Sequence, residues 1–175
     1  MKLVISAICC SALCWFPALA QGAHASKHAA TGMTDQQFVD FAAQTDMLEA
    51  HLGQMAQNQA DAQAVKDYAQ MLISDHTSDY QKLGLLTAKE GMNLPNGLDA
   101  EHNKMIEPLD KPHGAAFYKA YDHAMIEGHT KAIAIYKKES VDAQNADLRE
   151  YAAETLPTLQ KHLDGAKDLM KQGGK

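Results

Sequence analysis

The stretch Val65-Lys66-Asp67-Tyr68-Ala69 recurs in altered form as Leu148-Arg149-Glu150-Tyr151-Ala152. Each copy stands near the start of a segment in which apolar residues return at every third or fourth position. That spacing is typical of a helix with one buried face. An amphipathic segment of the same kind precedes each copy, so the sequence indicates an internal duplication and predicts two helical hairpins.

The apolar spacing predicts four long helices and a short extra one in the connection between the hairpins. Thr34 and Gln37 form a capping-box pattern at the first helix, and Gly91 is a suitable stop for the second. No segment alternates with period two for long enough to form a strand. The expected helices cover residues 34–59, 61–91, 98–106, 115–140 and 145–170.

This order of elements predicts an all-α, ferritin-like four-helix bundle, in which a long crossover containing the short extra helix joins two hairpins. A solenoid of helical repeats is the competing architecture. Two repeat units are too few to stack a stable array, so the bundle is the better prediction.

The first twenty residues have the features of a secretory signal peptide. Lys2 is followed by an apolar stretch, and Pro17-Ala18-Leu19-Ala20 ends in the small-residue pattern of a cleavage site. We therefore predict a signal peptide at 1–20, a flexible leader at 21–33 and the helical bundle at 34–171. Cleavage near Ala20 predicts a periplasmic or exported protein.

Composition excludes several classes of protein. All three cysteines, Cys9, Cys10 and Cys14, fall within the signal peptide, so disulfides and thiolate chemistry are excluded from the mature chain. The formal net charge of −6 and the lack of a long basic run argue against nucleic-acid binding. No later segment is apolar for long enough to predict integral membrane insertion after cleavage.

Four of the predicted apolar faces each carry one polar side chain that could bind a metal. These residues are Glu49, His76, His129 and His162. Glu49 and His51, like Glu127 and His129, are two positions apart and therefore point about 200° away from each other on a helix. The neighbouring apolar residues indicate that Glu49 and His129 face inward.

Imidazoles and one carboxylate suit zinc, iron or copper, so the four residues predict a site for one transition-metal ion. Asp75 and Asp79 flank His76 and are expected to support the site. Without a metal, each histidine would bond a backbone carbonyl, or Glu49 would pair with a histidine. The di-iron pattern of ferritins is incomplete, because Leu159 and Ile73 stand where a glutamate should precede each histidine by three residues.

Several motifs resemble those of a bacterial family of exported proteins, the domain of unknown function 4142 (DUF4142) family, whose members are often labelled outer-membrane proteins. The most specific motif is Thr155-Leu156-Pro157-x-Leu159-x-x-His162. The others are Met47-x-Glu49-x-x-Leu52-Gly53, Tyr68-Ala69-x-Met71-x-x-x-Asp75-His76 and Ala124-Met125-x-x-x-His129. The resemblance implies a ferritin-like bundle in the periplasm or cell envelope. It also implies an aspartate before the third-motif histidine, where this chain has Gly128.

The sequence thus predicts an exported helical-bundle protein that binds a transition-metal ion in its core. Two alternatives stay open. One is a structural or stress-related protein that binds another envelope component without a metal, and the other is a small metal-dependent oxidoreductase. No motif for a catalytic nucleophile or a phosphate loop occurs, which favours a binding protein over an enzyme.

Overall fold

The computed structural model describes residues 32–173, and every regular element of secondary structure in that range is a helix. The expected signal peptide and nearly all of the leader lie outside the described residues. The prediction of an all-α chain is confirmed for the described part. The helices are α1 (Asp35–Gln59), α2 (Gln63–Glu90), α3 (Ala100–Asp110), α4 (Ala115–Asp142) and α5 (Ala146–Gln172).

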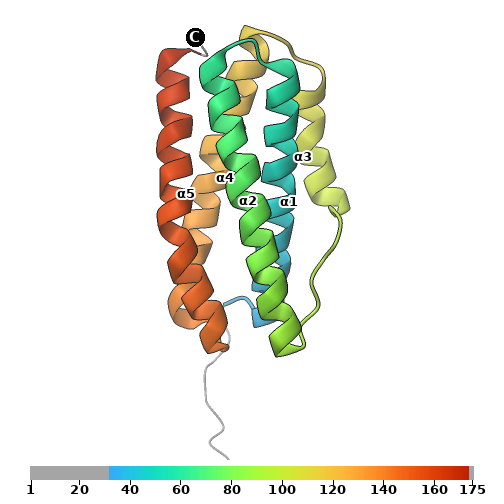
Figure 1. Ribbon diagram of the computed structural model, residues 1–175, viewed down its shortest axis with the longest axis vertical. Helices are drawn as coiled ribbons and strands as arrows, with labels where there is room; N and C mark the ends of the chain where they lie inside the picture. The colour runs from blue at the N-terminus through green and yellow to red at the C-terminus, as the bar shows by residue number, and fades with distance from the viewer. Residues whose placement is uncertain (1–31, 174–175) are drawn as a thin grey trace, which may run out of the picture.

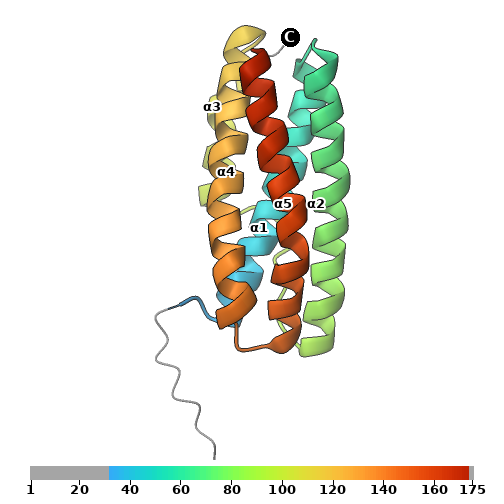
Figure 2. The same cartoon turned by 90° about the vertical axis from the view of Figure 1, so that its left-hand side faces the viewer.

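The four long helices run side by side along the length of the molecule (Figure 1). Helices α1 and α2 form one antiparallel hairpin, and α4 and α5 form the other, with the closest packing within each pair. The crossover returns along the bundle and carries α3, which lies outside the four helices against α1 and α4. Figure 2 shows α5 between α4 and α2, so the two hairpins also meet along α2 and α5.

Local sequence signals define the helix ends. The Thr34 hydroxyl accepts a hydrogen bond from the Gln37 amide, and the Gln37 side chain accepts one from the Thr34 amide, which confirms the predicted capping box. Gly91 ends α2 in the left-handed conformation, with φ of 66°, which glycine adopts without steric cost.

Helix α2 begins at Gln63 rather than near Asp61, because the turn before it is bonded to another helix. The amides of Asp61 and Ala62 both donate to the hydroxyl of Tyr118, at 2.8 and 3.1 Å. Helix α3 begins later than expected, because Asp99 caps it by accepting from the amide of His102, and it extends to Asp110.

The apolar core consists of two clusters, one toward each end of the bundle. The first contains Leu72 and Met125, and the second contains Leu83 and Ala132. On α1, α2 and α4, buried polar residues lie in the sequence between the residues of one cluster and those of the other, and on α5 the buried His162 lies one turn before Ala166, where the first cluster begins. The fold therefore encloses a polar layer at mid-height.

Glycines bring neighbouring helices close together at two points. A Cβ at Gly53 would lie 2.8 Å from Cγ1 of Ile73, and one at Gly165 would lie 2.9 Å from the Tyr68 ring. Tyr68 also donates from its hydroxyl to the backbone oxygen of His162, at 3.0 Å. Gly165 thus allows an aromatic residue of the first hairpin to contact the helix that carries His162.

Within residues 32–173, no helix has both the length and the apolar character that a membrane span requires.

Candidate metal centre

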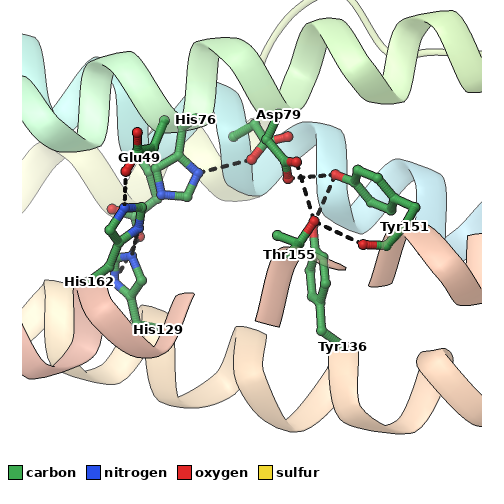
Figure 3. A network of polar contacts seen from close by, with 10 residues as sticks. Glu49, His76, Asp79, His129, Tyr136, Tyr151, Thr155 and His162 are labelled. Carbon is green, nitrogen blue, oxygen red and sulfur yellow. Dashed lines mark hydrogen bonds and ion pairs between the residues drawn. The ribbon is translucent and has the colours of Figure 1, made fainter. Parts of the chain in front are cut away.

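Three histidines from three helices converge in the polar layer at the centre of the bundle (Figure 3). His76 comes from α2, His129 from α4 and His162 from α5, and their exposed fractions are 2%, 1% and 0%. Each ring contributes one nitrogen to the centre, and these three nitrogens lie within 4.8 Å of one another. We refer to these three residues as the histidine cluster.

The outer nitrogens of two of these rings are fixed by oxygen acceptors. Nδ1 of His129 lies 2.8 Å from the backbone oxygen of Met125, so this nitrogen carries the proton and donates it. Nε2 of His162 lies 2.9 Å from Oδ2 of Asp75, and a carboxylate there accepts the ring proton. Such bonds fix the tautomer and the orientation of an imidazole, as outer partners do in metal sites.

His76 is held in the same way from α1. Its Nδ1 lies 2.9 Å from Oδ1 of Asp46, and both side chains are almost fully buried. When this nitrogen donates to the aspartate, Nε2 of His76 is left with a free lone pair. That atom has no hydrogen-bond partner among the described residues.

The inner nitrogens of His129 and His162 face each other without a proton between them. Nε2 of His129 and Nδ1 of His162 are 3.3 Å apart, and in the tautomers set by their outer bonds both are acceptors. Two metal–nitrogen bonds of about 2.0–2.1 Å at a tetrahedral angle give a similar nitrogen–nitrogen spacing of about 3.3 Å. The pair therefore has the separation that a shared cation requires.

Burial keeps the histidine cluster neutral at physiological pH. It lowers the pKa of His76 to about 4, although the nearby Asp79 and Asp75 oppose the shift. Burial also lowers the pKa of His129 to about 3 and that of His162 to about 4, and the neighbouring histidines add to both shifts. Neutral imidazoles present lone pairs, so all three rings are in the form that binds metals.

Glu49 lies beside the histidine cluster, and its carboxyl group does not face the three inner nitrogens. Its Oε1 is 4.0 Å from Nδ1 of His129, the nitrogen that already donates to Met125. Burial, reinforced by the charge of Asp46, raises the pKa of Glu49 to about 8. Its other oxygen, Oε2, has no hydrogen-bond partner among the described residues.

The inward and outward positions agree with the sequence prediction for α1 and α4. Glu49 and His129 are buried, whereas His51 and Glu127 are exposed. Helical geometry together with the neighbouring apolar residues was therefore sufficient to choose the correct member of each glutamate–histidine pair.

The two aspartates expected to support the site have different partners. Asp75 bonds the ring of His162, whereas Asp79 accepts from the Tyr151 hydroxyl at 2.7 Å and from the Thr155 hydroxyl at 3.2 Å. The hydroxyls of Tyr151 and Tyr136 are 3.4 Å apart, which extends this network toward α4 (Figure 3). Asp79 thus belongs to a tyrosine–threonine network next to the histidine cluster.

A polar groove between α2 and α5 leads to the histidine cluster. It has a volume of about 230 Å³. His76 and His162 lie along it, and Asp75, Lys82 and Glu154 are among its other residues. Lys82 and Glu154 form an ion pair across the two helices, at 2.5 Å. We call this hollow the α2–α5 groove.

Asp46 is the site residue that the sequence analysis did not identify. It is 2% exposed and orients His76, and burial together with Asp79 raises its pKa well above the usual range. A signal was present in the sequence, because Asp46 precedes Glu49 by three residues and therefore shares its helix face.

Comparisons with known proteins agree with the helical architecture. No curated protein sequence matches this chain. A solved structure described as "CopM in the Cu(II)-bound form" is similar in fold, with a TM-score of 0.68. The match covers 80% of this chain and 97% of that one, at 15% sequence identity. A family model with the description "Domain of unknown function (DUF4142)" matches residues 19–169, most of the sequence, and the chain therefore belongs to this family.

Proposed function

We propose that this protein binds one transition-metal ion, with copper as the preferred metal, through His76, His129 and His162. The observation that carries the proposal is the contact between Nε2 of His129 and Nδ1 of His162. Two lone pairs face each other at 3.3 Å in a buried site, and the outer nitrogens are already committed to oxygen acceptors. A bound cation would remove the repulsion between these lone pairs and would satisfy both.

Copper is favoured over zinc and iron by the chemistry of the donors. Three imidazoles suit all three metals, but divalent copper binds most tightly in the general order of affinities. The fold similarity to a protein solved with Cu(II) bound also supports the choice. Asp75 would raise the basicity of His162 by accepting its outer proton, and Asp46 would fix the orientation of the His76 ring through Nδ1.

The three histidines leave the fourth coordination position of the ion to another ligand. Glu49 was expected to provide it, and a change of side-chain rotamer would be needed, since its Oε1 lies on the outer side of His129. The α2–α5 groove offers the other route to a fourth ligand, because it joins His76 and His162 to the surface. A water molecule could then complete the coordination.

Metal analysis of the untagged full chain tests the proposal. We expect the histidine cluster to bind one Cu(II) per chain. We expect this ion to be lost in a His76→Ala/His162→Ala variant. The matched control is His51→Ala/His123→Ala, which removes two exposed histidines from the same bundle. Equal metal content in both double variants would sink the proposal and favour a purely structural role for the buried histidines.

A small metal-dependent oxidoreductase is a second candidate, favoured by the α2–α5 groove that reaches two histidines from outside. It predicts turnover of peroxide or oxygen by the copper-loaded protein in the presence of a reductant. A loaded protein that is inert to both would exclude this candidate and leave the binding function intact.

We further propose that the bundle has the ferritin-like arrangement of two hairpins joined by a long crossover, and that the protein is exported to the periplasm or cell envelope. The crossover, which carries α3 along the bundle between two hairpins, supports the first point. The apolar stretch and Ala18-Leu19-Ala20 support the second. Cell fractionation and N-terminal sequencing of the mature protein test export, and a cytoplasmic, unprocessed chain would refute it.

A further inference from the structure

A second hollow lies between α1, α3 and α4. It has a volume of about 730 Å³, within the range of pockets that hold small organic molecules. Most of its wall is apolar. Residues that line it include Phe41, Leu48 and Leu52 of α1, Met105 and Leu109 of α3, and Ala120 of α4. We call it the α3 pocket.

A single buried acid lies in the wall of this apolar pocket. Glu49 lines the α3 pocket and is only 3% exposed, and its Oε2 has no hydrogen-bond partner among the described residues. A buried acid without a partner is costly, and a hydrogen-bond donor or a cation at this position would offset the cost. A ligand of this mostly apolar pocket should therefore carry one hydrogen-bond donor or one positive charge, placed next to Glu49.

Gly128 keeps the approach to this acid open. It also lines the α3 pocket, and a Cβ at this position would lie 3.0 Å from Oε1 of Glu49. A glycine on the inner face of α4 thus leaves room next to the carboxyl group, where any larger residue would crowd it.

The outer part of the pocket limits the charge of a ligand. Lys119 and Lys131 line it, and Lys131 lies 5.9 Å from the centre of the Phe41 ring. Two ammonium groups there disfavour a ligand with a second positive charge. Glu127 and His123 also line the pocket, and both are exposed at its rim.

We propose that the α3 pocket binds an apolar monoamine, with the apolar body against α1, α3 and α4 and the ammonium group donating to Glu49. None of the three histidines lines the α3 pocket, so an amine can bind there without displacing a histidine from the copper ion, and it would compete with the metal only for Glu49. The bound ammonium donates to the Glu49 carboxylate, which the described residues leave without a partner at Oε2, and the proton of the ligand-free carboxyl group is released to solvent on binding.

Calorimetric titration of metal-free full-length protein tests the assignment, with decylamine as the probe and decanoate and decanol as comparisons, all below their micellar concentrations. We expect one decylamine per chain, and weaker binding of the other two. Glu49→Gln should reduce the affinity for decylamine roughly tenfold or more, because a charge-assisted hydrogen bond is lost.

Two tryptophan variants distinguish binding in the pocket from binding elsewhere on the surface. Ala116 is exposed and lines the α3 pocket, so Ala116→Trp should fill it and abolish binding. Ala134 is equally exposed on α4 but does not line the pocket, so Ala134→Trp should bind decylamine as the unmodified chain does. Absence of binding, tighter binding of decanoate, or an unchanged affinity in Glu49→Gln would each overturn the proposal.

Discussion

Oδ2 of Asp75 lies 2.9 Å from Nε2 of His162, and the aspartate side chain is 30% exposed while the histidine is fully buried. A carboxylate at the surface thus orients a ring in the centre of the bundle. Asp75 also lies 3.8 Å from the ammonium group of Lys161. This relationship connects the α2–α5 groove directly to one of the proposed ligands.

Asp75→Asn is expected to weaken copper binding by about 10- to 100-fold, the usual effect of removing an outer partner of a ligating histidine. The stoichiometry should not change, because all three imidazoles remain. Competition with a chelator of known affinity gives the measurement. Asp164→Asn is the control, since Asp164 is an exposed aspartate of α5 whose side chain, among residues 32–173, bonds only Gln160. Equal affinities of the two variants would contradict the role of Asp75.

His129→Leu is expected to abolish copper-induced stabilisation without weakening the metal-free protein. His129 lies in the sequence between core residues Met125 and Ala132, and leucine has a similar volume and no lone pair. Thermal unfolding with and without copper gives the measurement. Copper at 100 times its Kd should stabilise the unmodified chain by about 2.7 kcal/mol. A variant that still gains this stability would show that His129 is not a ligand.

The contribution of the histidine cluster to the stability of the metal-free protein is expected to increase as the pH rises from about 4 to 6.5. The pKa values of His76, His129 and His162 fall to about 4, 3 and 4 in the folded state. In this window the unfolded chain binds protons that the folded chain does not, so acid favours unfolding. Urea unfolding across this range should give a shallower slope for His129→Leu than for the unmodified chain.

Glu49 predicts the opposite trend at higher pH. Its pKa rises from 4.5 to about 8, so the folded state keeps a proton that the unfolded chain loses. Its contribution to the free energy of unfolding therefore decreases as the pH rises from about 4.5 to 8. Glu49→Gln should remove this decrease, and a variant with an unchanged profile up to pH 8 would refute the assignment.

Lys82→Ala is expected to speed copper uptake. Lys82 is a cation in the α2–α5 groove, and its removal makes the approach more negative through Asp75, Asp79 and Glu154. Stopped-flow measurements at low ionic strength should show the difference, which salt should reduce. Lys89→Ala is the control, because Lys89 is an exposed lysine of α2 that does not line the groove. Equal uptake rates for both variants would argue for a different access path.

The sequence was sufficient to predict the helices and the inward faces, because these depend on local spacing. The four long helices begin and end within about two residues of their expected limits, and Glu49, His76, His129 and His162 are all buried. The hydrogen-bond partners were harder to predict, because they depend on how one helix is shifted along another.

Asp46 and Asp79 illustrate this limit. Asp46 bonds His76 across the hairpin, whereas Asp79, only three residues after His76, bonds Tyr151 and Thr155 of α5 instead. Both contacts are set by the packing of α2 against its two neighbours, which the periodicity of a single helix does not contain. The position of Glu49 relative to the outer nitrogen of His129 has the same origin.

The distribution of the three histidines over the chain has a mechanical consequence. His76 belongs to the first hairpin, whereas His129 and His162 belong to the second, and no cysteine follows Cys14 in the sequence. A shared ion would therefore cross-link the two hairpins. Where the ion stays bound to the unfolded chain, it would reduce the conformational entropy of that chain, as a disulfide does in other proteins. Loss of the ion would allow the hairpins to separate along α2 and α5 first, with hydrogen exchange rising at that seam.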